Sequence, residues 1–417
     1  MKRYRLLEGK AGMTVLALFL LFQLLLARDS LVTTSILGFT RAQLLLAGGT
    51  ALLGAAFLAR NLGAWRKIVS DRRMGLAAAA AAILALPCLL KRDWQLMYFS
   101  ILFCILLGVF MTYIASLEQV SRVYAALMAV LGAYSILATD FLRGIAQTGA
   151  VPFFYNSTEV KFYNFGLAFV SESYVKNRNF GIFREPGVYQ YFILLALYLN
   201  QEHAHWSKAW VRPLISGVLA LTMLTTLATG GVLELGLFAV FLFFDKKRYR
   251  KKAAWVVVIL LLALLAGALA VIIAQRGELY WELYGMTVSK FLPGQESAVD
   301  RVQALWVDIA LFLDHPILGA SIVQVLHAMQ NNTSSTLILF AILGLAGGCL
   351  HVAGWVALVW RRERNVFGNL ALLAILFMAF NTQNLTADVF FWLFPTMALV
   401  ERLMGEGKEE DKWNRQC

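Results

Sequence analysis

Residues 95–115 read QLMYFSILFCILLGVFMTYIA, an apolar run of 21 residues without a charged side chain. A helix needs about 20 such residues to cross the hydrocarbon core of a bilayer, which is about 30 Å thick. Similar runs recur along a chain of 417 residues that is 60% hydrophobic, 13% aromatic and 15% charged. This composition predicts an all-α, polytopic integral membrane protein.

The apolar runs predict about twelve transmembrane helices. They cover residues 11–27, 42–59, 74–90, 95–115, 121–140, 186–200, 213–228, 231–244, 253–274, 335–360, 366–380 and 388–403. Only Thr229-Gly230 separates the seventh and eighth of these helices. If the two formed one helix, the six basic residues within 245–252 would lie outside the membrane, which the positive-inside rule opposes.

Two long polar stretches and the predicted helices divide the chain into five segments. Residues 1–140 hold the first five helices, and residues 141–185 form the first large loop. Residues 186–274 hold helices six to nine, residues 275–334 form the second large loop, and residues 335–417 hold the last three helices and a tail. Both large loops are predicted to lie on the same side of the membrane.

Basic residues gather in the short connections. Lys and Arg outnumber Asp and Glu in residues 60–73, 245–252 and 361–364, all on the side of the basic N-terminus. That side is therefore predicted to be cytoplasmic, with both termini inside and both large loops outside. The same rule explains the net charge of +12 without nucleic-acid binding. Met1–Arg5 resembles a signal n-region, but no small-x-small cleavage site follows it, so an uncleaved first helix is expected.

The large loops are rich in aromatic residues, as in residues 153–155, 162–165 and 280–284. Such clusters are typical of a belt at the level of the lipid headgroups, and a groove that stacks sugars or cradles lipid is the alternative. Residues 300–313 carry apolar side chains at helical spacing, which predicts an interfacial helix that stops at Asp314-His315-Pro316.

Arg178, Arg184, Glu185 and Pro186 form the strongest candidate site. Pro186 suits the first turn of a helix, and the N-terminus of a helix favours an anion. Arg178 and Arg184 add charge and bidentate geometry suited to phosphate oxygens. A purely structural role stays open, in which these arginines pair with Glu185 or with a lipid headgroup.

The second large loop contributes Asp300 and Arg301, and then the polar segment 331–336, which includes Asn332 and Thr333. This segment precedes another predicted helix, and ordinary capping explains it as well as ligand binding does.

These residues resemble the O-antigen ligase and polymerase superfamily. Arg301, Trp306 and the run His315-Pro316-Ile317-Leu318-Gly319 look like the pattern in the last large external loop of that family. Gly344-Leu345-Ala346-Gly347 is similar to its Gly-x-x-Gly helix, and residues 183–187 resemble its Arg/Glu-Pro-Gly segment. The resemblance covers residues 178–347.

The chain departs from the ligases of that superfamily. Thr333-Ser334 stands where a ligase typically carries His-Asn, and His327 lies six residues upstream. This favours a polymerase. At the turn where the family often has Ser-Arg, the chain has Thr229-Gly230-Gly231, so a phosphate contact there must come from backbone N–H groups.

The resemblance implies a Wzy-like polysaccharide polymerase with a GT-C-like fold in the cytoplasmic membrane of a bacterium. Such an enzyme is a metal-independent glycosyltransferase without a cofactor. It joins polyprenyl-diphosphate-linked repeat units at the outer face, and a chain-length regulator and a flippase are expected partners. The implied catalytic residues are Glu185, Arg184 and Arg301. The implied substrate-binding residues are Arg178, Glu172, Asp300, Trp306, His327, Asn332 and Thr333.

Two assignments stay open at this stage. Glu185 is the first choice for a general base, with Glu172, Asp300 and His327 in reserve, although Glu185 equally suits holding an arginine in place. Glu234, about one turn inside a predicted helix, belongs to the floor of the same cavity or pairs with a neighbouring helix. A ligase and a transporter or flippase of lipid-linked sugars are the alternative functions, although a transporter usually shows an internal repeat, which this chain lacks.

Overall fold

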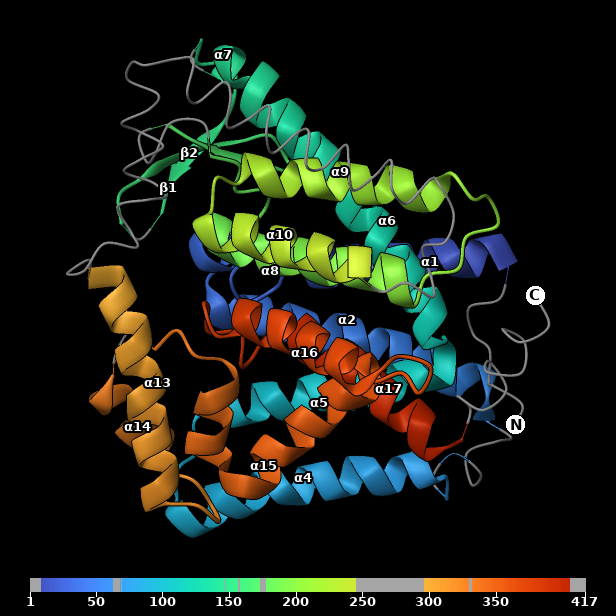
Figure 1. Ribbon diagram of the computed structural model, residues 1–417, viewed down its shortest axis with the longest axis vertical. Coiled ribbons are helices and arrows are strands. Elements are labelled where there is room, and N and C mark those ends of the chain that lie inside the picture. The colour runs from blue at the N-terminus through green and yellow to red at the C-terminus, as the bar shows by residue number, and fades with distance from the viewer. Residues whose placement is uncertain are drawn as a thin grey trace. The chain divides into compact units, whose positions relative to one another are not determined.

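The structure is a computed structural model that describes residues 9–62, 68, 70–146, 148–156, 158–172, 178–244, 296–329 and 332–405. The chain is mostly helical and forms two compact units, each assembled from separated stretches. Unit 1 comprises residues 1–124, 305–360 and 384–417, and unit 2 comprises residues 125–304 and 361–383. Figure 1 shows the elements of both units.

Five helices are long and apolar enough to cross a membrane. They are α2 (Phe39–Arg60), α4 (Arg72–Lys91), α5 (Leu96–Ile114), α6 (Leu117–Ile136) with its continuation η3 (Leu137–Phe141), and α15 (Thr336–Val359). Other helices at predicted positions are α1 (Gly9–Leu25), α8 (Pro186–Glu202), α9 (Val211–Thr225), α10 (Thr229–Phe244), α16 (Val366–Phe380) and α17 (Val389–Leu403). The predicted helix 253–274 lies outside the described residues. The protein is therefore a multi-pass membrane protein.

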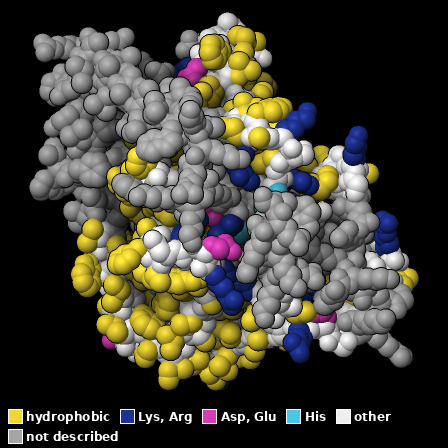
Figure 2. Space-filling model, turned by 45° about the vertical axis from the view of Figure 1, so that its right-hand side comes forward, with side chains coloured by type: hydrophobic (Ala, Val, Ile, Leu, Met, Phe, Trp, Pro, Cys, Tyr) yellow, Lys and Arg dark blue, Asp and Glu magenta, His cyan; other side chains and the backbone are white. Residues whose placement is uncertain are grey.

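Apolar side chains remain on the surface of these helices. Leu44 and Leu52 of α2 are 68% and 74% exposed. Figure 2 shows hydrophobic side chains over a broad area of one face, with Lys and Arg side chains in separate groups. Exposed apolar area on a long helix suits contact with lipid chains.

In unit 1, α5, α15 and α17 pack closely because small residues lie at their contacts. A Cβ atom on Gly354 of α15 would lie 2.9 Å from Cβ of Pro395 in α17, and one on Gly108 of α5 would lie 2.7 Å from Cβ of Thr396. α4 packs on α5, where Nη1 of Arg73 donates a 2.9 Å hydrogen bond to the carbonyl of Thr112.

In unit 2, α8 is buried along its length and contacts α9, α10 and α16. The connection between α9 and α10 is Thr226–Ala228, with Leu227 at φ 49°, so α9 and α10 are separate helices as predicted. The turn falls just before Thr229-Gly230, which instead opens α10.

The first large loop differs from the all-α prediction, because it forms a three-stranded antiparallel sheet. Strand β1 (Phe153–Tyr155) pairs with β2 (Lys161–Asn164), and β2 pairs with β3 (Phe169–Ser171). Phe154, Phe162 and Phe169 pack on one face of the sheet, with ring centroids 5.5–5.9 Å apart around Phe154. Residues in strands alternate between faces, so these aromatic residues form a core for the loop.

The second large loop contains α13 (Glu296–Asp314) and α14 (Ile322–Ala328). α13 ends at Asp314, as predicted from Asp314-His315-Pro316. The predicted interfacial stretch 300–313 falls within α13, which Figure 1 shows together with α14. The side chain of Trp306 on α13 is 67% exposed.

Candidate functional site

Arg184 and Glu185 stand at the start of α8. Nη1 of Arg184 lies 3.6 Å from Oε1 of Glu185, and both side chains are about half exposed. Glu185 is the residue before the first turn, but its side chain makes no capping hydrogen bond, and Pro186 opens the helix as predicted. Exposed ion pairs contribute little to stability, so a role in binding costs the fold little.

The turn before α8 is held by buried Asn179. Nδ2 of Asn179 donates to Oγ of Ser135 at 2.9 Å and to Oγ1 of Thr225 at 3.0 Å. Its Oδ1 accepts a 2.9 Å hydrogen bond from the backbone of Gly181. Gly181 has φ 55°, and a Cβ atom there would lie 2.6 Å from the ring of Tyr189. Hydrogen bonds on three sides fix the segment that carries Arg178 and Arg184.

The N-terminal turns of α8 and α10 lie against each other. A Cβ atom on Gly230 or Gly231 would lie 2.9 or 2.8 Å from the side-chain amide of Gln190, so glycine permits this approach. Nε of Arg178 donates a 3.0 Å hydrogen bond to the carbonyl of Thr226, at the turn before α10. The N-terminal turns of two helices therefore meet beside Arg178 at one end of unit 2, and Arg184 lies two residues before α8. Two helix N-termini with nearby arginines favour an anion.

Two further carboxylates of unit 2 have different surroundings. Glu234 of α10 is fully buried one turn below Gly230. Glu172 follows β3, accepts a 2.5 Å hydrogen bond from the Tyr163 hydroxyl and pairs with Lys161 at 3.1 Å. These contacts lower the pKa of Glu172, with the Tyr163 bond as the larger cause, so Glu172 is a weaker base than a free glutamate.

Exposed aromatic rings lie on β1, the edge strand of the sheet. Phe153 and Tyr155 are 55% and 58% exposed, with ring centroids 5.9 Å apart. Nζ of Lys161 lies 4.6 Å from the ring centroid of Phe153. Either use predicted for the aromatic residues, headgroup contact or sugar stacking, suits this surface.

In unit 1, the predicted binding residue Asn332 is buried against Asp308 of α13. Nδ2 of Asn332 donates a 2.7 Å hydrogen bond to Oδ1 of Asp308, and Oδ1 of Asn332 accepts one from the backbone of Ser334. Burial raises the pKa of Asp308 to about 7, against the hydrogen bonds from Asn332 and Ser334. Asn332 therefore holds the polar segment before α15, but Ser335, the residue at the helix start, makes no side-chain capping hydrogen bond, so the capping alternative stays a prediction. Neighbouring Thr333 is partly buried, and His327 is exposed on α14.

The glycine motif 315–319 of the second loop packs against the glycine motif 344–347 of α15. α15 is broken at Gly344, which has φ 65° and ψ −163°. A Cβ atom there would overlap the carbonyl of Ile317, and one on Gly319 would overlap the backbone of Ile342. The backbone of Leu345 donates a 2.8 Å hydrogen bond to the carbonyl of Pro316. The motif residues 315–319 and 344–347 thus pack backbone against backbone.

Lys91, the last residue of α4, forms hydrogen bonds to the segment after motif residue Ile317. Its Nζ atom donates hydrogen bonds of 2.6 and 2.9 Å to the carbonyls of Leu318 and Ala320. The carboxylate of nearby Asp93 accepts a 2.8 Å hydrogen bond from the backbone of Ile322, at the start of α14. The sequence reasoning singled out neither Lys91 nor Asp93.

The predicted site residues come from both units. Arg178, Arg184, Glu185 and Glu172 belong to unit 2, whereas Trp306, His327, Asn332 and Thr333 belong to unit 1. Asp300 and Arg301 lie on α13, and their side chains are outside the described part of the chain. Among the described residues, the predicted site residues that the structure brings together are therefore those at the starts of α8 and α10.

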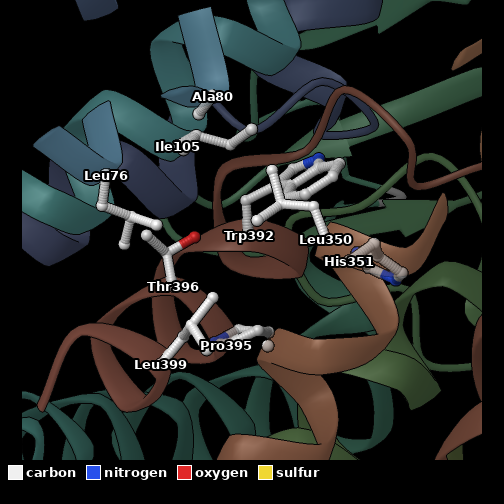
Figure 3. A pocket seen from close by; sticks show the side chains of 10 residues that line it. Leu76, Ala80, Ile105, Leu350, His351, Trp392, Pro395, Thr396 and Leu399 are labelled. Carbon is white, nitrogen blue, oxygen red and sulfur yellow. The ribbon is translucent and has the colours of Figure 1, made fainter. Parts of the chain in front are cut away.

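An enclosed cavity in unit 1 is not a substrate site. It has a volume of about 10 Å³, and Figure 3 shows Trp392, Pro395, Thr396 and His351 among the residues around it. Such a volume holds about one water molecule. It has no room for a sugar.

Sequence reasoning missed Asn179, Ser135, Gln190 and Asp308. Ser135 and Gln190 are polar residues within predicted apolar helices, and this pattern could have singled them out. Comparison of the chain with protein families, curated proteins and solved structures finds no match.

Proposed function

We propose that the protein is a polysaccharide polymerase, a glycosyltransferase that joins polyprenyl-diphosphate-linked repeat units at the outer face of the cytoplasmic membrane. The proposal rests on the resemblance of residues 178–347 to the O-antigen polymerase and ligase superfamily. One structural observation carries it furthest: the N-terminal turns of α8 and α10 meet beside Arg178 and Arg184.

The chemistry of the donor explains why this cluster suits the reaction. Transfer of the glycan breaks the bond between its anomeric carbon and a diphosphate oxygen, and negative charge develops on the diphosphate. Fixed arginines and helix N-termini stabilise that charge without moving during the reaction. The Asn179 hydrogen bonds supply this fixed geometry. Arg301 of α13 is proposed to contribute from the second loop.

Glu185 is the proposed base for the acceptor hydroxyl. It is exposed, lies beside Arg184 and does not cap α8. A base removes the proton as the hydroxyl attacks, so Glu185→Gln is expected to lower kcat by about 10²–10⁴ with little change in KM. If Glu185 only orients Arg184, the same change raises KM for the donor and leaves Glu185→Asp active.

The direct test is reconstitution. Purified protein is incubated with lipid-linked repeat units, and the products are separated on a gel. A ladder of lipid-linked oligomers supports the polymerase. Consumption of the donor without any oligomer overturns it. No reaction of the protein, in an assay in which a flippase used as the control is active, overturns it as well.

The ligase alternative is tested in a null strain. Loss of a polymerase leaves one repeat unit on the final carrier and removes longer chains. Accumulation of long polymer on polyprenyl diphosphate, with nothing on the carrier, identifies a ligase. His327→Ala sharpens the test, because a polymerase that uses Glu185 keeps its activity and a ligase that uses His327 loses it.

The break in α15 favours the transporter alternative, because discontinuous helices line the binding sites of many transporters. A transporter would move lipid-linked units between leaflets without joining them. Flipping of a fluorescent lipid-linked sugar in proteoliposomes, with no oligomer formed, is the result that this alternative predicts.

A further inference from the structure

A groove of about 940 Å³ lies between α10 and α16 in unit 2. Its apolar wall comes from both helices and includes Val240, Phe241, Phe367 and Ala374. Its polar end is the connection before α16, with Arg362, Glu363, Arg364 and Asn365. Val240 is 52% exposed and Phe367 84% exposed, so the groove opens at the surface of the unit.

The polar end carries a net positive charge. Nη2 of Arg364 donates a 2.8 Å hydrogen bond to Oε2 of buried Glu202, and its guanidinium lies 5.0 Å from the ring centroid of Phe241. Nε of Arg361 lies 2.9 Å from the same Glu202 oxygen. Three arginines, 361, 362 and 364, face two carboxylates, Glu202 and Glu363, which leaves a net positive charge.

The start of α16 adds to this charge. Asn365 caps the helix through a hydrogen bond from the backbone of Gly368 to its Oδ1, and the positive end of the helix dipole lies at the polar end of the groove. An anionic head at this end and an apolar tail along α10 and α16 would match the groove at both ends.

We propose that this groove binds one anionic phospholipid, with its phosphate at Arg362 and the start of α16 and an acyl chain between α10 and α16. The charge distribution of the sequence puts residues 361–364 on the cytoplasmic side, where the leaflet carries anionic lipids. The volume lies within the range of small-molecule sites. The bound lipid fastens α16 to α10, at the opposite end of the buried helix α8 from Arg184.

Native mass spectrometry of the full chain tests the proposal, with dioleoyl phosphatidylglycerol and dioleoyl phosphatidylcholine as probes in mixed micelles. The protein is expected to retain one phosphatidylglycerol in preference to phosphatidylcholine. Arg362→Gln should weaken phosphatidylglycerol binding about fivefold, because one Arg near a membrane surface contributes about that factor. Arg72→Gln, an exposed arginine of α4 outside the groove, is the matched control and should change nothing.

Ala374→Trp fills the apolar wall and is expected to abolish retention of both lipids, whereas Ala79→Trp on the exposed face of α4 is expected to leave it intact. Equal retention of the two lipids, or equal loss in Arg362→Gln and Arg72→Gln, overturns the proposal. Unchanged lipid retention in Ala374→Trp, with normal elution of the variant on gel filtration, overturns it as well.

Discussion

Loss of the single positive charge of Arg184 is expected to reduce polymer synthesis strongly. Its guanidinium stands at the start of α8, next to Glu185. Arg184→Ala should lower polymer synthesis by about 10²–10³, the usual cost of removing one group that stabilises developing charge. Arg184→Lys should restore only part of the activity, because an ammonium cannot form the bidentate contact. Polymer length on gels and protein level on blots measure the outcome.

Arg92→Ala provides the control for Arg184, because Arg92 is also exposed and is predicted to lie on the same outer side. Arg301→Ala is expected to match Arg184→Ala. Normal chains in both Arg184→Ala and Arg301→Ala would remove the assignment to the diphosphate.

Asp308 is expected to make stability depend on pH. Burial raises its pKa to about 7, from about 3.9 in an unfolded chain. Its favourable contribution is complete below about pH 4 and is lost as the pH rises to 7, by about 1.4 kcal/mol for each pH unit at most. The thermal midpoint of the unaltered protein should therefore be lower at pH 8 than at pH 5. Asp308→Asn should make this difference between the two midpoints smaller.

Asp314→Asn, at the exposed end of the same helix, is the control for Asp308. The difference between the midpoints at pH 5 and pH 8, measured in detergent, should shrink only in Asp308→Asn. The same difference in both variants would contradict the assignment to Asp308.

At the scale of elements, the break in α15 depends on Gly344. Its φ and ψ lie in a region that only glycine readily adopts, and a Cβ atom would overlap the carbonyl of Ile317. Gly344→Ala is expected to cost about 3 kcal/mol or more, because strain and overlap add. Thermal unfolding and the yield of folded protein are the measurements.

Gly236→Ala is the matched control for this element, since a Cβ atom on Gly236 of α10 meets nothing within 4 Å. It should be neutral or stabilising by up to about 1 kcal/mol, as alanine favours a helix. If Gly344→Ala were as stable as Gly236→Ala, α15 would be continuous in the folded protein.

At the scale of the whole molecule, the expected topology has both large loops outside and both termini inside. Single cysteines at exposed Thr158 and Gln303, in a background without the four natural cysteines, should react with an impermeant maleimide in intact cells. Cysteines at exposed Ser70 and Arg362 should react only after the membrane is opened. Labelling of Ser70 in intact cells, or its absence at Thr158, would require a different helix count.

The sequence by itself determined the apolar helices of the described residues and the multi-pass class, because transfer of an apolar run into lipid depends on residues that are neighbours in the chain. It also determined the end of α13 at Asp314, but it did not predict α14. It also singled out Arg184, Glu185 and Pro186, since Pro186 marks a helix start locally. Only the tertiary structure decided the sheet of the first loop, the break at Gly344 and the meeting of α8 with α10. These features depend on hydrogen bonds and close approaches between distant residues, such as Asn179 with Ser135 and Gly344 with Ile317, and no local pattern specifies such partners.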